Sequence, residues 1–288
     1  SKQRSSVWPK MLRRAPQNKD VNLMPKTILV TGATDGIGLE TAKKLVSAGH
    51  HVLVHGRNPA KLDAAQKLLA ALPGDGTTQA YLADVSKMAE VSDLAEQVSG
   101  QHDRLNVVIN NAGVYKMPNP ITDDGFDARF VVNTIAPFIL TQKLMPRMTA
   151  TGRIVNVSSA AQAPVNPDAM AGRTHLEDME AYAQSKLAIT MWTNALAGSR
   201  TDGPILVAVN PGSLLASKMV KEGFGVAGSD LGIGADILTR AALSDEFADA
   251  NGKYFDNDAG QFGPPHADAL DPRKCERVVA AIEQLLAN

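Results

Sequence analysis

From residue 26 onward, the hydrophobic residues of the chain follow two alternating patterns. Short apolar runs are typical of strands buried on both faces of a sheet, and longer amphipathic segments are typical of helices. The alternation of the two predicts a parallel sheet with crossover helices. We expect strands near residues 26–31, 51–55, 77–82, 106–110, 152–158, 203–209 and 253–256, and a last helix near 272–287.

This pattern predicts an α/β fold: a doubly wound parallel Rossmann sheet of about seven strands with helices on both faces. No linker divides it, so we expect a single domain over residues 26–288. Residues 1–25 carry six basic side chains and little hydrophobic periodicity, which predicts an arm outside the domain. Trp8 could anchor this arm on the domain or on a partner subunit.

Composition and charge exclude several classes of function. The 29 basic and 30 acidic residues nearly cancel, so we expect a small-molecule partner and no nucleic acid. A single cysteine, Cys275, excludes an internal disulfide and a cysteine-based zinc site, and we expect no metal. No run approaches the ~18 apolar residues of a membrane span, so we expect a cytoplasmic protein without one.

A glycine-rich loop, Thr31 to Gly38 (TGATDGIG), lies directly between the first expected strand and the first expected helix. Glycines there allow a tight turn and a close approach to a pyrophosphate at the helix N-terminus. The pattern G-x-x-x-G-x-G differs from the general fingerprint G-x-G-x-x-G, but the order of strand, loop and helix supports dinucleotide binding. The expected cofactor contacts in this loop are Gly32, Thr34, Asp35, Gly36, Ile37 and Gly38.

The end of the second strand bears on the choice between NADP and NAD. An acidic residue there would bind the ribose 2′-hydroxyl, but this chain has Gly56, followed by Arg57 and Asn58. A guanidinium matches a 2′-phosphate, so the sequence favours NADP(H), with NAD(H) possible. Asp35 is a contrary sign, because a basic residue in the loop would have strengthened the NADP interpretation.

Polar residues end the next three expected strands. Asp84 and Val85 could bracket an adenine, although Asp84 could instead cap the following helix. Asn110 to Gly113 (NNAG) end the fourth strand, and Ser158 and Ser159 end the fifth. No histidine and acid stand in a hydrolase spacing, so a serine here is expected to hydrogen-bond a substrate oxygen.

Tyr182 and Lys186 stand four residues apart in a strongly helical segment, so both lie on one helix face. A neighbouring ammonium would lower the pKa of a phenol from about 10. Tyr182 could then exchange a proton with a substrate oxygen.

Six motifs together resemble those of the short-chain dehydrogenase/reductase family over nearly all of residues 26–288. They are the glycine loop, Asn110-Asn111-Ala112-Gly113, Asn133, Ser159, Tyr182-x-x-x-Lys186 and Asn210-Pro211-Gly212. The resemblance implies an enzyme in which a nicotinamide transfers the hydride.

The resemblance also implies residue roles. Tyr182 would be the general acid in carbonyl reduction and the general base in alcohol oxidation. Lys186 would hold the nicotinamide ribose and lower the tyrosine pKa, Ser159 would polarise the carbonyl, and Asn133 would hold a water beside Lys186. The implied cofactor contacts also include Asn111, Ala112, Gly113, Pro211, Gly212 and, after a one-residue shift, Ser217.

An inserted segment around 167–178 and the motif Gly252 to Asp256 (GKYFD) resemble the branch of retinol-dehydrogenase-like and protochlorophyllide-reductase-like enzymes. We expect segments 114–122, 160–178 and 213–229 to form an apolar pocket for an aldehyde, ketone or alcohol. The alternatives are reduction of an activated double bond and a catalytically silent NADP(H) sensor.

The resemblance further implies a homodimer or homotetramer built through the helices near 127–149 and 179–200. The apolar residues that could form this interface, or could instead belong to the core, are Ala136, Ile139, Leu187, Ile189 and Met191.

Overall fold

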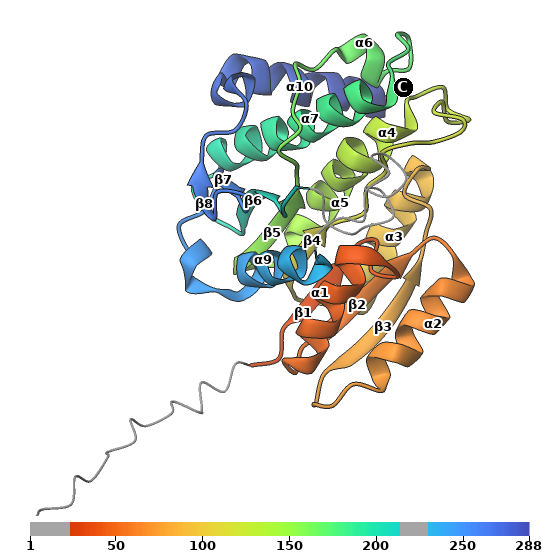
Figure 1. Cartoon of the computed structure of the whole chain (residues 1–288), viewed down its shortest axis with the longest axis vertical. Helices are drawn as coiled ribbons and strands as arrows, with labels where there is room; N and C mark the ends of the chain where they lie inside the picture. The colour runs from red at the N-terminus through yellow and green to blue at the C-terminus, as the bar shows by residue number, and fades with distance from the viewer. Residues whose placement is uncertain (1–23, 214–229, 288) are drawn as a thin grey trace, which may run out of the picture.

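A computed structural model describes residues 24–213 and 230–287 of the chain. Its strands form one sheet in the order β3-β2-β1-β4-β5-β6-β7-β8 (Figure 1). The strands are β1 (Thr27–Val30), β2 (His51–Gly56), β3 (Thr77–Leu82), β4 (Leu105–Asn110), β5 (Met148–Val157), β6 (Ile205–Asn210), β7 (Tyr254–Asp256) and β8 (Gln261–Gly263). Strands β1 to β7 run parallel, and the order reverses between β1 and β4, which confirms the predicted doubly wound fold.

The sheet differs from the expected one mainly at its last edge. Strand β8 pairs antiparallel with β7 across a short turn in which Gly260 has φ +68°. Three residues are too few to show a hydrophobic period, so this strand could not be predicted from the sequence. Strand β5 also begins at Met148, earlier than expected, with an irregular register against β4 between Leu105 and Val107.

Helices cover both faces of the sheet (Figure 1). One layer contains α1 (Gly36–Ser47), α2 (Pro59–Ala70) and α9 (Leu231–Leu243). The other contains α3 (Met88–Gln101), α5 (Ala136–Leu144) and α7 (Asp178–Gly198), and α10 (Pro272–Leu286) packs on α7. The short helices are α4 (Ala128–Phe130), the π-helical turn η1 (Val131–Ile135), η2 (Met145–Arg147), α6 (Pro167–Met170), η3 (Asp245–Phe247) and η4 (Ala267–Leu270).

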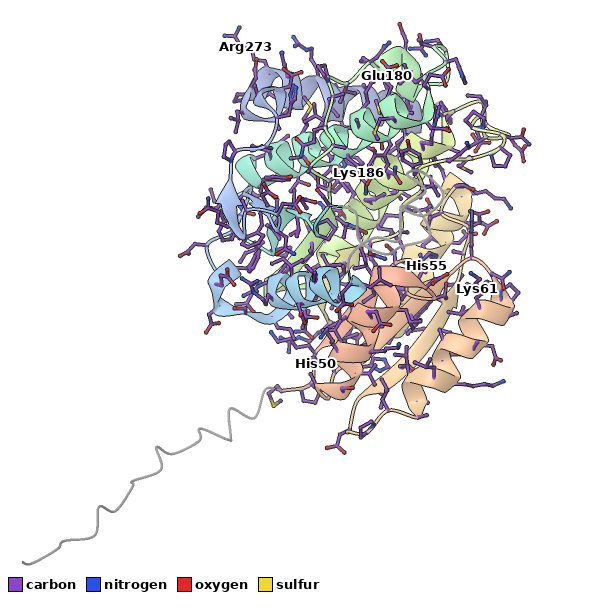
Figure 2. The ribbon with its side chains drawn as sticks, viewed as in Figure 1. His50, His55, Lys61, Glu180, Lys186 and Arg273 are labelled. Atoms are coloured by element: carbon purple, nitrogen blue, oxygen red, sulfur yellow. The ribbon has the colours of Figure 1, made fainter. Side chains whose placement is uncertain are left out.

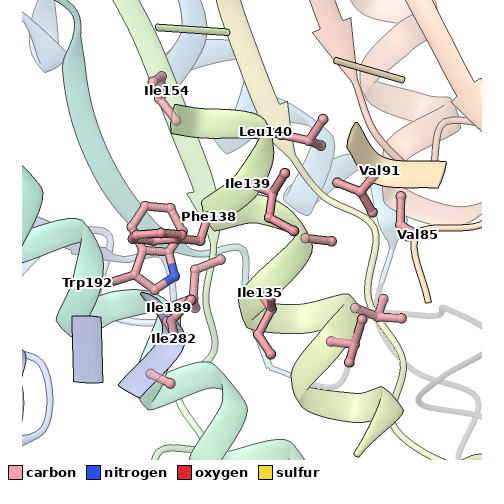
Figure 3. Packing of buried hydrophobic residues seen from close by; sticks show 14 of the residues in the cluster. Val85, Val91, Ile135, Phe138, Ile139, Leu140, Ile154, Ile189, Trp192 and Ile282 are labelled. Atoms are coloured by element: carbon pink, nitrogen blue, oxygen red, sulfur yellow. The ribbon is translucent and has the colours of Figure 1, made fainter. Parts of the chain in front are cut away.

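Successive residues of a strand point to opposite faces of the sheet and pack into two separate cores. In β1, Leu29 joins the cluster beneath α3, α5 and α7, whereas Ile28 and Val30 join the cluster beneath α1, α2 and α9. The first cluster is shown in Figure 3, where Phe138 lies against Trp192, with 5.6 Å between ring centroids and an interplanar angle of 86°. Burial on both faces explains why the strands are continuously apolar.

The apolar residues that we expected at a subunit interface are all buried within the chain. Ala136, Ile139, Leu187, Ile189 and Met191 are each no more than 5% exposed. They pack in the core because α7 lies between the sheet and α10 and α5 packs against α3, so this set does not present an exposed apolar face.

Candidate active site

A cavity of about 570 Å³ lies at the carboxyl edge of the parallel strands. Loops that follow six neighbouring strands end at this edge and meet α7 there. The cavity is lined by predicted site residues: Gly32, Thr34, Asp35, Gly36, Ile37, Arg57, Asn58, Asp84, Val85, Asn111, Ala112, Gly113, Ser159, Tyr182, Lys186, Pro211 and Gly212. A second cavity of about 690 Å³, between α3, α5 and the end of α10, is lined by other residues, so chemistry rather than size identifies the candidate site.

The glycine loop has the geometry that a bound pyrophosphate requires. Gly32 has φ +65°, and a Cβ atom there would lie 2.9 Å from the Cα of Ala112. Gly38 serves a different purpose, because its Cβ would lie 2.2 Å from the Gly32 carbonyl oxygen and would separate the helix from the loop. Gly36 has φ +56° and faces the cavity at the first turn of α1. This cradle therefore fits a dinucleotide phosphate at a helix N-terminus.

Asn111 ties the end of β4 to this loop. Its side-chain amide donates to the carbonyl oxygens of Thr31 and Gly32 at 2.9 and 3.2 Å. The Thr31 hydroxyl in turn accepts the backbone N–H groups of Asn111 and Ala112, each at 3.0 Å. The two loops are thus a single hydrogen-bonded unit.

At the end of β2, Gly56 packs against the Thr34 side chain, and a Cβ at position 56 would lie 2.4 Å from Cγ2 of Thr34, which would have to shift. Arg57 is exposed and lines the cavity beside it. Asn58 also lines the cavity, but its side chain caps α2 by accepting the backbone N–H of Lys61 at 3.0 Å. No acidic side chain therefore occupies the strand-end position.

Asp35 and Lys61 form an ion pair of 3.2 Å across the same rim of the cavity. Asp35 also caps α1 by accepting the backbone N–H of Gly36 at 2.8 Å. The acidic side chain that we counted against NADP is thus partly neutralised by a lysine that sequence analysis missed. Lys61 lies in the first turn of α2, on the helix face next to the capping residue Asn58. This position in the sequence is the signal from which its place at the cavity rim could have been predicted.

Asp84 lines the cavity while its carboxylate accepts the backbone N–H and the hydroxyl of Ser86, at 3.0 and 2.7 Å. It therefore closes a turn, whereas the N-cap of α3 is Lys87, so the structure contradicts the alternative in which Asp84 only caps this helix. Burial raises the pKa of Asp84, but the Ser86 hydrogen bonds and the nearby Arg57 outweigh it and hold the pKa below its usual range.

The two serines at the end of β5 have different environments. Ser158 is 2% exposed, donates to the Lys186 carbonyl at 3.1 Å and lies 2.7 Å from the Thr190 hydroxyl. Ser159 is partly exposed, its Oγ accepts the backbone N–H of Ala161 at 3.1 Å, and its side chain lies close enough to Tyr182 to act on the pKa of that phenol. The structure thus brings Ser159, and not Ser158, to the tyrosine.

Tyr182 and Lys186 both line the cavity, and the Nζ atom of Lys186 lies 5.8 Å from the centroid of the tyrosine ring. Nζ donates a 2.7 Å hydrogen bond to the carbonyl of Val157, and burial lowers the pKa of Lys186 to about 8. Burial raises the pKa of Tyr182, an effect opposed by the hydrogen bond with Ser159 and reinforced by Tyr115. Our expectation of a lowered tyrosine pKa was wrong for this structure, since desolvation dominates and the ammonium is directed at Val157.

Asn133 lies in the π-helical turn η1, behind the residues that line the cavity. Its amide donates to the Val114 carbonyl at 2.8 Å and to Ser185 Oγ at 2.9 Å, and its Oδ1 accepts the Val114 N–H at 2.8 Å. The side chain therefore fixes the chain that leaves β4. A side chain at Gly113 would lie 3.4 Å from Asn133 Oδ1 and 3.6 Å from Lys186 Nζ.

Acidic residues at the end of β7 and just after it hold the turn at Pro211 and Gly212. Asn210 donates to Asp256 and Asp258 at 2.9 Å each, and the N–H of Ser213 donates to Asp258 at 2.8 Å. Predicted contacts further along this segment, including Ser217 and most of the expected pocket segment 213–229, lie outside the described residues.

Two aromatic contacts near the reacting groups were not predicted individually. Tyr115 lines the cavity with its ring edge toward Tyr182, at 5.5 Å between centroids and 61° between planes. Tyr254, within the motif GKYFD, donates to the Ser159 carbonyl at 3.1 Å. Tyr115 falls in the expected pocket segment 114–122, but nothing in the sequence distinguishes it there.

The family model described as short chain dehydrogenase matches residues 26–225. The chain belongs to the short-chain dehydrogenase family. It is therefore an oxidoreductase that acts on small molecules, in a family that uses NAD(P). Among the residues described here, no helix is long and apolar enough to cross a bilayer.

Comparisons with individual proteins agree with this family assignment. Retinol dehydrogenase 13 of Homo sapiens is 30% identical over 260 residues, which cover 80% of this chain and 76% of that protein. This similarity confirms the retinol-dehydrogenase-like part of the predicted resemblance. A structure of a protein from Mycobacterium paratuberculosis has a TM-score of 0.74 at 28% identity, covering 90% of this chain and 92% of that one. A short-chain dehydrogenase from Shigella flexneri, complexed with NADP, has a TM-score of 0.65 at 26% identity, covering 81% and 97%.

Proposed function

We propose that this short-chain dehydrogenase is an NADP(H)-dependent oxidoreductase that interconverts an apolar carbonyl compound and its alcohol. The observation that supports this most is the meeting of Ser159, Tyr182 and Lys186 in the cavity that also contains the glycine loop. A bound nicotinamide would supply or accept the hydride.

The residues of the chain would handle the proton. Because burial raises the pKa of Tyr182, its hydroxyl is protonated at neutral pH and can donate to the oxygen of a carbonyl undergoing reduction. Ser159, whose side chain lies beside Tyr182 in the same cavity, would bind that oxygen and orient it. Lys186, with Nζ buried beside the tyrosine ring, would bind the ribose hydroxyls and supply positive charge near the developing alkoxide.

Four features of the β2 end support NADP(H) over NAD(H). The strand ends in Gly56, which has no acidic side chain to repel a 2′-phosphate. Arg57 and Lys61 line the same rim, and both are cationic. Asp35 is paired with Lys61, so its negative charge is partly compensated.

An apolar substrate is supported by the aromatic and aliphatic side chains near Tyr182, among them Tyr115 and Val114. Two relatives carry the names retinol dehydrogenase 13 and polyprenol dehydrogenase, which also favour an apolar alcohol or its carbonyl form. Reduction would be the direction when NADPH is the cofactor in excess.

The test is oxidation of NADPH and NADH in parallel against aldehydes, ketones, quinones and enones. We expect turnover with a carbonyl substrate, and we expect Tyr182→Phe to lower kcat about 10²- to 10⁴-fold with little change in NADPH affinity. Tyr81→Phe is the control, since this buried tyrosine bonds His102 away from the cavity. An active Tyr182→Phe enzyme would refute the proton-donor role, and turnover of enones alone would favour double-bond reduction. NADPH binding with no turnover of any kind would favour a sensor.

The same assay examines cofactor choice. Arg57→Asp should weaken NADPH far more than NADH, because the carboxylate repels a 2′-phosphate and can bind a 2′-hydroxyl. Equal effects on both cofactors would refute the contact between Arg57 and the phosphate.

A further inference from the structure

His55, near the end of β2, lies between two loops of the cofactor cavity and is only 1% exposed (Figure 2). Its Nδ1 atom lies 3.1 Å from the backbone nitrogen of Gly32, in the glycine loop. Its Nε2 atom lies 3.0 Å from the carbonyl oxygen of Ala83, which directly precedes Asp84 and Val85. One imidazole therefore spans the loops that follow β1 and β3.

These two contacts determine the protonation state of His55. A backbone N–H can only donate and a carbonyl can only accept, so Nδ1 must be the bare acceptor and Nε2 must carry the proton. An imidazolium would direct an N–H at the N–H of Gly32 and break that bond. Burial lowers the pKa of His55, and the Ala83 carbonyl and the nearby Asp84 oppose this only in part, so the neutral form is favoured at neutral pH.

The bond to Gly32 restrains the residue on which the phosphate cradle depends. Gly32 has φ +65° and leaves no space for a Cβ against Ala112, so its conformation is tightly defined. The bond that Nε2 donates to the Ala83 carbonyl fixes the His55 tautomer that can accept from Gly32. Neither contact is needed to form the sheet, because β2 is already paired with β1 and β3 along its length.

We propose that His55 is a positioning residue that holds the glycine loop in its dinucleotide-binding conformation and thereby sets the affinity for NADP(H). The proposal rests on the proposed function, since it concerns the same cofactor.

Two substitutions separate the two hydrogen bonds. In His55→Asn the side-chain oxygen stands near the position of Nδ1 and can still accept from Gly32, whereas the bond to Ala83 is lost. In His55→Gln the terminal amide nitrogen stands near the position of Nε2 and can still donate to Ala83, whereas the bond from Gly32 is lost. We expect the dissociation constant of NADPH to rise about tenfold in His55→Gln and less than about threefold in His55→Asn. At saturating NADPH, kcat should stay within about twofold of the wild type in both.

His50 provides a matched control at the opposite end of β2 (Figure 2). It is also 1% exposed, and its Nδ1 accepts the backbone N–H of Lys26 at 3.2 Å, away from the cavity. His50→Gln should therefore lower the melting temperature without changing the dissociation constant of NADPH.

The measurement is fluorescence titration of each folded variant with NADPH, with melting temperatures recorded alongside. Unchanged affinity in His55→Gln, or equal weakening in His55→Gln and His55→Asn, would overturn the positioning role. A wild-type protein that binds neither NADPH nor NADH would instead refute the proposed function. Weakening confined to His55→Gln, with His50→Gln unaffected, would establish the role of the Gly32 contact.

Discussion

Replacing Arg129 by methionine would test what holds the inserted segment to the domain. Arg129 and Asp127 are each 1% exposed and form a double hydrogen bond of 3.0 and 2.7 Å. The same guanidinium donates to the Leu176 carbonyl at 2.9 Å and to Asp178 at 3.1 Å. These last two residues lie where the insert enters α7, four to six residues before Tyr182.

The size of the effect follows from burial. Removing the guanidinium leaves the Asp127 carboxylate in the interior without a counterion, and breaking a buried ion pair in this way costs about 3–5 kcal/mol. The backbone N–H of residue 129 still reaches Asp127, at 2.9 Å in the wild type, so the loss should not exceed that range. We therefore expect the free energy of unfolding of Arg129→Met to fall by about 3–5 kcal/mol.

Urea unfolding followed by circular dichroism would measure this loss, with Arg173→Met as the control. Arg173 pairs with Asp168 through bonds of 3.0 and 2.6 Å, but both side chains are more than 60% exposed. An exposed pair of this kind contributes at most about 1 kcal/mol. Comparable losses in the two variants would refute the reasoning, because only the Arg129 pair is buried and only Arg129 also donates to Leu176 and Asp178.

Two further predictions concern the reacting groups. Burial lowers the pKa of Lys186 to about 8, so its ammonium is present below that pH and lost above it. In steady-state assays kcat/KM for reduction should be level up to about pH 7.5 and fall about tenfold per unit well above pH 8; a level profile to pH 10 would contradict a need for the ammonium. Tyr254→Phe removes the 3.1 Å hydrogen bond to the Ser159 carbonyl. We therefore expect kcat to fall several-fold, which corresponds to a rise of about 1 kcal/mol in the activation free energy, and KM for NADPH to stay unchanged. A change confined to KM for NADPH would place Tyr254 with the cofactor instead.

The fold and most of the cavity lining could be predicted because their signals are local. The glycine loop lies between a strand and a helix, and Asn111, Ser159 and Pro211 each follow an apolar run. In a parallel sheet the carboxyl ends of strands share one edge, so residues far apart in the chain must meet there. The order of these motifs along the chain was therefore enough to predict that their loops lie together at one edge of the sheet.

The parts that sequence could not supply depend on contacts across elements. Lys61 reaches Asp35 from a different helix, and His55 reaches Gly32 and Ala83 from a neighbouring strand. Neither pairing has a fixed spacing in the sequence. The apolar residues of α5 and α7 were equally ambiguous, because a helix covered by α10 and one covered by a second subunit have the same pattern.

The direction in which the Tyr182 pKa shifts likewise depends on contacts that the sequence does not reveal. The four-residue spacing correctly placed Lys186 beside the tyrosine, and from that spacing alone the ammonium should have lowered the phenol pKa. Spacing carries no information about burial or about where Nζ points. In the structure Nζ bonds the Val157 carbonyl, and desolvation raises the tyrosine pKa while lowering that of the lysine.

A phenol with a raised pKa suits one direction of the reaction better than the other. Tyr182 remains protonated across neutral pH and can donate to a carbonyl oxygen without first acquiring a proton, whereas alcohol oxidation needs the phenolate. Burial lowers the pKa of Lys186, but only to about 8, so its ammonium is still charged below that pH. The proton donor and the ammonium of the proposed mechanism are therefore both present in the neutral range, and together with the proposed use of NADP(H) this favours reduction as the working direction.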